Sequence, residues 1–197
     1  LSVGTGALLL FGAVQMTMIG HGIWSGERLQ KLQIAGLILA SFGLIVLLLP
    51  TLSAPPLYSS VLMLSAGIAW GVYSLRGKGD GNSVELTAGN FFLAVPMAAL
   101  LSLCMLNEIS LDGNGIWLAV ASGALASAVG YAMWYAALTG LKTTYAAVVQ
   151  LSVPVIAAFG GIVFLNEFLT LHLILSSIAI LGGIALIVLE KQTTKRA

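Results

Sequence analysis

Seven long apolar runs constrain this chain more than any other feature of its sequence. They cover residues 3–24, 31–49, 57–75, 86–106, 115–138, 143–165 and 171–190, and short breaks rich in polar residues, glycine or proline separate them. The hydrocarbon core of a bilayer takes about 20 residues of helix, and a backbone in lipid must satisfy its hydrogen bonds within its own segment. The pattern therefore predicts an all-α membrane protein with seven transmembrane helices.

The composition agrees with lipid as the main solvent. Of the 197 residues, 59% are hydrophobic and 8% are charged, whereas about a quarter of a soluble domain is charged. The net charge of +1 is too small for a basic patch, so we expect no nucleic-acid partner. The sequence has no cofactor motif and no metal-ligand motif, and we expect neither group. Cys104 lies in an apolar run, where we expect a small buried hydrophobic side chain.

The basic residues predict the orientation of the spans. All eight fall on one side, and the opposite loops contain only acidic charges. The basic residues are Arg28, Lys31, Arg76, Lys78, Lys142, Lys191, Lys195 and Arg196, and the acidic loop residues are Glu108, Asp112 and Glu167. Because positively charged loops stay in the cytoplasm, we expect a multi-pass protein of the cell (inner) membrane, with Leu1 outside and the C-terminus cytoplasmic.

Spans one and two match spans six and seven at a constant offset of 140 residues. Glu27 corresponds to Glu167, and Gly43 corresponds to Gly183. The two glutamates lie on opposite sides of the predicted membrane, so the two copies are inverted. Inverted repeats are typical of secondary transporters, whose substrate site lies near the membrane midplane between the repeats. Both glutamates lie at helix ends, where we expect each to anchor or cap the following helix.

Three longer stretches carry a family resemblance. They are 66–73 (AGIAWGVY), 127–138 (SAVGYAMWYAAL) and 150–167 (QLSVPVIAAFGGIVFLNE). In this order they resemble the drug/metabolite transporter superfamily, specifically its EamA branch. The resemblance implies a ten-helix fold of two inverted five-helix repeats, of which this sequence lacks the first three helices. Residues 1–50 are then the last two helices of the first repeat, 57–190 the complete second repeat, and 191–197 a basic cytoplasmic tail.

Polar and aromatic side chains within the spans are the candidates for a substrate site. Ser127, Tyr131 and Trp134 share one helix face at spacings i, i+4 and i+7. An amide in hydrocarbon is costly unless it is paired or faces water. Three amides within the spans, Gln15, Asn90 and Gln150, are therefore candidates as well. The candidate substrate-binding residues are Gln15, Trp70, Tyr73, Asn90, Ser127, Tyr131, Trp134 and Gln150. The alternative is structural, with amides bonded between helices and aromatic rings in an interfacial belt.

Pro154 and the two histidines complete the set of polar or special residues. Pro154 removes a backbone donor one turn after Gln150, so we expect a kink used in gating and a freed carbonyl that faces the same cavity. We expect His21 to be a hydrogen-bonded structural residue near the cytoplasmic interface. We expect His172 to be solvated at the outer end of the last span.

The sequence favours a transporter over the other classes of membrane protein. Span seven has no mid-span lysine for retinal, and no nucleophile–base pair indicates an intramembrane enzyme. A channel, a receptor-like or scaffolding protein and an inactive transporter fragment stay open. We expect a small organic metabolite, such as an amino acid, a nucleobase or a drug-like compound, to move by alternating access. The expected partners are this substrate and the lipid bilayer. Polar faces left exposed by three absent helices favour a homodimer, or collapse, over an open cavity.

Overall fold

A computed structural model describes residues 3–51, 56–78, 82–106, 112–165 and 168–194. Within these residues all regular structure is helical, and seven helices are long and apolar enough to cross a membrane. They span Thr5–Trp24, Lys31–Leu48, Leu57–Arg76, Val84–Cys104, Gly113–Leu138, Thr143–Phe164 and Leu171–Leu189. The prediction of seven spans is confirmed, with boundaries within a few residues of those expected.

Two of the spans consist of more than one helical segment. The elements are α1 (Val3–Trp24), α2 (Lys31–Leu48), η1 (Leu49–Thr51), α3 (Leu57–Arg76), α4 (Ser83–Cys104), α5 (Gly113–Val120), η3 (Ala121–Val129), α6 (Gly130–Leu138), α7 (Thr143–Val149), α8 (Ser152–Leu165) and α9 (Leu171–Thr194). Span five consists of α5, the π-helix η3 and α6, and span six consists of α7 and α8. A π-helix is wider than an α-helix and is often found at functional positions.

The chain forms two compact units. The first contains Leu1–Leu75 and Lys142–Ala197, and the second contains Arg76–Leu141. The first unit therefore holds α1, α2, α3, α7, α8 and α9, and the second holds α4, α5, η3 and α6. The repeat boundaries at 1–50 and 57–190 stay a prediction.

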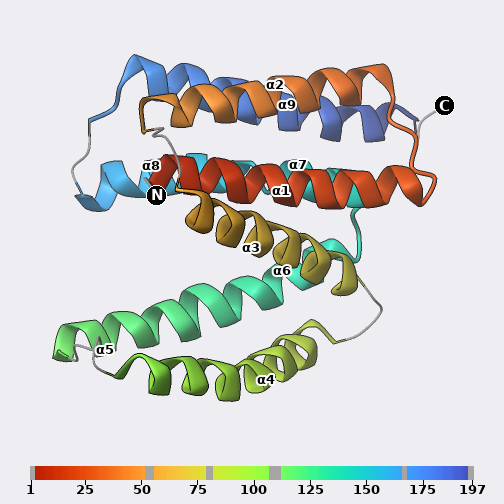
Figure 1. The fold of residues 1–197 in the computed structure, drawn as a ribbon. Helices are drawn as coiled ribbons and strands as arrows, with labels where there is room; N and C mark the ends of the chain where they lie inside the picture. Colours follow the sequence, from red (N-terminus) through yellow and green to blue (C-terminus); the bar gives the residue numbers. More distant parts are fainter. Residues whose placement is uncertain (1–2, 52–55, 79–81, 107–111, 166–167, 195–197) are drawn as a thin grey trace. The chain divides into compact units, whose positions relative to one another are not determined.

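Helices α2 and α9 of the first unit pack through glycines. Figure 1 shows the two helices side by side and running in opposite directions. A Cβ atom added to Gly36 would lie 2.5 Å from the Gly183 carbonyl oxygen, and one added to Gly43 would lie 2.9 Å from the Ala179 Cβ. Apolar burial drives helix association weakly in lipid, so close backbone packing of this kind holds membrane helices together.

Helix α3 packs on α1 in the same way. A Cβ atom added to Gly67 would lie 2.5 Å from the Leu10 carbonyl oxygen, and one added to Gly71 would lie 2.8 Å from the Thr17 Cβ. Trp70 lies on α3 between these two glycines. The close approach of α3 to α1 at Gly67 and Gly71 therefore places Trp70 next to α1.

Many large apolar side chains point away from the protein. Trp24 is 90% exposed and Phe164 is 82% exposed. Cys104 is also exposed, so the expectation that it is buried is wrong. Exposed apolar side chains suit a lipid surrounding, and a membrane span can be apolar on all sides.

Candidate functional site

Span six is interrupted at Gln150 and Leu151. Pro154 has no amide hydrogen, so it cannot donate to the Gln150 carbonyl four residues earlier. Val153 N donates to that carbonyl instead, at 3.1 Å, and Leu151 N donates to Val148 O at 3.0 Å. The Gln150 carbonyl is therefore paired, and the expectation that it faces a cavity as a free group is wrong. These three-residue bonds end α7 in mid-span.

Gln15 fills the gap that this interruption leaves in the backbone hydrogen bonds. In a regular helix Leu151 N would bond to Ala147 O, but here the Gln15 Nε2 donates to Ala147 O at 2.5 Å. A carbonyl only accepts, so this bond determines which end of the Gln15 amide is the nitrogen. The Gln15 Oε1 is buried and has no hydrogen-bond partner among the described atoms. The side chain as a whole is 8% exposed.

Gln150 and Trp70 form the other half of this site. The Trp70 Nε1 donates to the Gln150 Oε1 at 2.5 Å, and the Gln150 Nε2 lies 3.1 Å from the Met18 Sδ, a weak acceptor. The Tyr73 ring lies beside Trp70, with a centroid distance of 6.3 Å and an interplanar angle of 36°. We call Gln15, Met18, Trp70, Tyr73 and Gln150 the amide–aromatic cluster. It joins α1, α3 and the interruption between α7 and α8.

The remaining sequence candidates lie in the second unit. The Asn90 Nδ2 donates to the Tyr135 hydroxyl at 3.2 Å, and the Phe91 and Tyr131 rings meet edge to face at 5.8 Å. Ser127 and Trp134 are half-buried.

Ser127 lies in the π-helix, whereas Tyr131 lies in the α-helix that follows. The predicted common face assumes regular α-helical turns across this junction, and the wider π turns shift the register between the two side chains.

Sequence reasoning missed three residues that contact the candidates. Met18 contacts Gln150, and Phe91 and Tyr135 contact the candidates of the second unit. Tyr135 is adjacent to Trp134 within a stretch that carries the family resemblance. Its position in the sequence could therefore have identified it as a candidate. Met18 gave no signal, because one more apolar side chain in an apolar helix is not distinctive.

Glu27 binds the N-terminus of α7. Gly26 has a φ of +87°, which favours glycine, and the turn that it forms leads the chain back toward the end of α1. The Glu27 carboxylate accepts from Thr143 N at 2.9 Å, Thr144 N at 3.1 Å and the Thr144 hydroxyl at 2.8 Å. Of the two predicted roles, helix-end anchor or cap on the following helix, the second is wrong, because the cap is on α7, whose first residue is 116 residues away. Glu167 and Glu108 lie outside the described residues.

The pKa of Glu27 reflects two opposing effects. Burial raises the pKa, but the hydrogen bonds from Thr144 and Thr143 favour the ionised carboxylate and together outweigh burial. The pKa therefore lies below its ordinary value of 4.5. A carboxylate at a helix N-terminus also interacts favourably with the helix dipole.

The two histidines lie at different positions in the fold. His21 is exposed and its Nδ1 lies 3.3 Å from the Ser25 hydroxyl, as expected of a hydrogen-bonded residue. The His172 Nε2 lies 2.7 Å from the Val46 carbonyl oxygen near the end of α2. The expectation that His172 is simply solvated is therefore wrong. In the described part of the chain, no three His, Cys, Asp or Glu side chains gather as metal ligands would.

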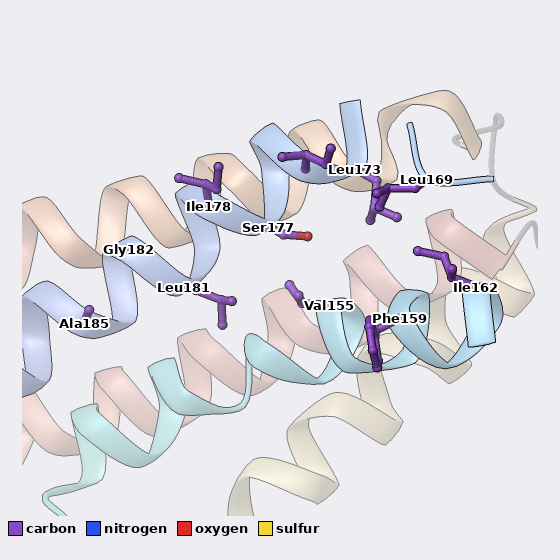
Figure 2. A pocket seen from close by; sticks show the side chains of 11 residues that line it. Val155, Phe159, Ile162, Leu169, Leu173, Ser177, Ile178, Leu181, Gly182 and Ala185 are labelled. Carbon is purple, nitrogen blue, oxygen red and sulfur yellow. The ribbon is translucent and has the colours of Figure 1, made fainter. Parts of the chain in front are cut away.

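An apolar groove of about 550 Å³ lies between α8 and α9 (Figure 2). Its walls include Phe159, Ile162, Leu173 and Leu181, and Ser177 is the one polar side chain among the lining residues. The groove has almost nothing to orient a polar solute. The amide–aromatic cluster has hydrogen-bonding groups and is therefore the candidate site.

Seven apolar spans define the chain as a multi-pass membrane protein. Residues 57–189 match the EamA-like transporter family. The chain belongs to this family.

Two relatives and one solved structure are similar to this chain. An uncharacterized protein of Pseudomonas aeruginosa, PA1977, is 52% identical over 95% of this chain. A "probable amino-acid metabolite efflux pump" of Salmonella typhimurium is 26% identical over 92% of this chain. The chain spans 65% and 66% of the lengths of these two relatives. A crystal structure of a protein 19% identical has a TM-score of 0.78 and matches 98% of this chain and 69% of its own, which shows the fold alone.

Proposed function

We propose that the protein carries a small organic metabolite across the inner membrane by alternating access. The observation that carries this proposal is the amide–aromatic cluster at the interruption of a membrane-spanning helix. Secondary transporters place their substrate sites near the midplane, at helices that are broken in the same way. Gln15 lies near the middle of the span Thr5–Trp24, so the cluster is at the depth where such a site is expected.

The cost of burying amides in a membrane supports a binding role. Polar groups deep in a span are costly unless they are paired or line a water-filled path. Gln15 and Gln150 are 8% and 5% exposed, and one of their four polar groups, the Gln15 Oε1, is unpaired among the described atoms. A purely structural pair of amides would use this acceptor as well.

The packing of α2 on α9 supports two inverted repeats. Gly43 and Gly183 correspond at the offset of 140 residues, and each is at a close approach between these two helices. A pseudo-two-fold axis in the membrane plane relates inverted repeats, and it would produce a pair of equivalent helices that run in opposite directions. We therefore propose a ten-helix fold of five-helix repeats, with 1–50 and 57–190 belonging to different repeats.

The chemistry of the spans supports an organic substrate. The amide–aromatic cluster has no charged side chain to hold an inorganic ion, whereas aromatic rings and amides suit an amino acid, a nucleobase or a drug-like compound. The name of the Salmonella typhimurium relative agrees with export of such a solute. We propose a substrate-binding role for the cluster and a gating role for Pro154. For the second unit, taken by itself, we propose a substrate-binding role for Asn90, Ser127, Tyr131 and Trp134.

The charge distribution supports a cytoplasmic C-terminus. Every basic residue lies on one side of the seven spans, as the positive-inside rule requires of cytoplasmic loops. Export then means movement from this basic side to the side that carries Asp112.

Transport by inside-out vesicles tests the proposal. Vesicles from cells with and without the full-length protein would be incubated with a cell extract, with and without an imposed proton gradient, and their contents compared by mass spectrometry. We expect at least one organic metabolite to accumulate only with the protein, and Trp70→Phe to reduce this accumulation. Trp117→Phe is the matched control, since Trp117 is 76% exposed on α5. Equal contents in both kinds of vesicle would refute transport.

A further inference from the structure

The amide–aromatic cluster also indicates which kind of molecule it binds. Resting on the proposed function, we propose that the substrate is uncharged and donates an N–H group, of an amide or a heterocycle, to the Gln15 Oε1. The inference comes from which polar groups of the cluster are already paired and from the absence of charge around them.

The hydrogen bonds within the cluster leave an acceptor for the ligand. The Gln15 Nε2 is bonded to Ala147 O, the Gln150 Oε1 to Trp70, and the Gln150 Nε2 to the Met18 Sδ. The Gln15 Oε1 is the group without a partner among the described atoms. Rotating the Gln15 amide by half a turn would set oxygen against oxygen at Ala147, so the acceptor cannot be exchanged for a donor. A ligand that donates gains a bond here, and a ligand that only accepts does not.

The charge of the surroundings decides between a neutral and a charged donor. Spans one and six contain no Lys, Arg, Asp or Glu, and in span three the one such residue, Arg76, is at the end of the helix. An ammonium group at this depth would have no countercharge from these spans. The cost of a charge at the bilayer centre exceeds the gain from one hydrogen bond to a neutral oxygen. A neutral N–H donor gains the bond without that cost, which narrows the proposed substrates to uncharged nucleobases and drug-like compounds and leaves out amino acids.

The aromatic members favour a flat substrate. The Trp70 indole is held through its Nε1 by Gln150, and the Tyr73 ring lies beside it. Aromatic side chains pair with other flat rings in offset-stacked or edge-to-face arrangements. A planar heterocycle or an aromatic amide suits these side chains and the Gln15 acceptor.

Matched pairs of compounds test this inference. The full-length protein in nanodiscs would be titrated with uracil and 1,3-dimethyluracil, benzamide and N,N-dimethylbenzamide, and indole and 1-methylindole, with phenethylamine as the cation. Binding would be followed by the rise of the thermal unfolding midpoint with concentration. Gln15→Met removes the acceptor. Gln33→Met is the matched control, because Gln33 is also buried but its amide is paired at both ends, with Gln30 N and the Tyr145 hydroxyl.

We expect the N–H member of at least one pair to bind about three- to tenfold more tightly than its methylated partner. Gln15→Met should abolish this preference, Gln33→Met should keep it, and phenethylamine should bind more weakly than that N–H compound. The inference is overturned if methylated members or the cation bind as tightly as the N–H members, if no compound binds, or if Gln15→Met keeps the preference. The comparison within pairs uses the unaltered protein and stays decisive if Gln15→Met does not fold. The vesicle assay with a cell extract detects transport of any organic metabolite, whether or not it is an uncharged N–H donor. The proposed substrate class can therefore be refuted while the proposed transport function stands.

Discussion

Replacing Glu27 should loosen α7 at its N-terminus. Two backbone amides and one hydroxyl, from Thr143 and Thr144, donate to this one carboxylate. Helix α7 has only seven residues and is followed directly by the interruption at Gln150, so it has few internal hydrogen bonds. Glu27→Ala leaves all three donors without their acceptor, whereas Glu27→Gln keeps one oxygen and loses the charge.

The magnitude follows from the contacts. Loss of a capping side chain costs about 0.5–2 kcal/mol. Hydrogen bonds to a charged group are stronger than hydrogen bonds between neutral groups. Glu27 is half-buried, so water screens part of the charge. We expect Glu27→Ala to lower the free energy of unfolding by about 2 kcal/mol and Glu27→Gln by about 1 kcal/mol.

The stabilisation should depend on pH. The pKa of Glu27 is below its ordinary value, so the ionised carboxylate stabilises the fold above the ordinary value, and this contribution is lost as the pH falls through the lowered pKa. The protein and Glu27→Gln should therefore differ in unfolding midpoint at pH 7 and converge at a pH well below 4.5. Glu85→Gln is the matched control, because Glu85 is an exposed acid in the first turn of α4.

Hydrogen exchange gives a local measurement of the same effect. In Glu27→Gln the amides of Thr143 and Thr144 should exchange faster at pH 7, and those in the middle of α9 should not change. Unchanged exchange at these two amides, together with an unchanged unfolding midpoint, would refute the capping role. A loss of stability that is the same at every pH would refute the role of the charge.

Three further predictions concern the topology, the second unit and the packing of α2 on α9. In a background without the native cysteine, a cysteine at position Gly140 should be labelled only from the cytoplasm and one at Gly113 only from outside; labelling of both from one side would contradict the orientation. Trp134→Ala should abolish transport in the vesicle assay and leave the amount of folded protein unchanged on size-exclusion chromatography, whereas normal transport would remove Trp134 from the site. Gly183→Ala should lower the unfolding midpoint by an amount equivalent to about 1–3 kcal/mol, because its Cβ would overlap the α2 backbone. Gly182→Ala should not lower the midpoint, because no atom lies within 4 Å of its Cβ, and equal effects of the two changes would contradict the packing.

The sequence by itself determined the seven spans, and with them a multi-pass membrane protein. A bilayer acts on each segment separately, through its length, its apolarity and the need to pair its own backbone. For this reason the runs at 3–24 and 171–190 could be recognised without knowing what they pack against. The choice of Gln15 and Gln150 as candidates rests on the same local argument, because an amide in hydrocarbon is conspicuous wherever it packs.

Only the tertiary structure decided how the polar groups pair. No local pattern indicates that Glu27 caps α7 rather than the helix that follows it, because its carboxylate suits the N-terminus of either helix. Nor does the sequence show that the Gln15 Nε2 replaces a backbone donor at Ala147, 132 residues away. These contacts depend on which helices pack together, and in lipid that choice depends on close fit between surfaces of similar apolarity. Within the part of the chain that the structure describes, this packing leaves the Gln15 acceptor unpaired. The proposed substrate class depends on this acceptor, which cannot be read from one helix alone.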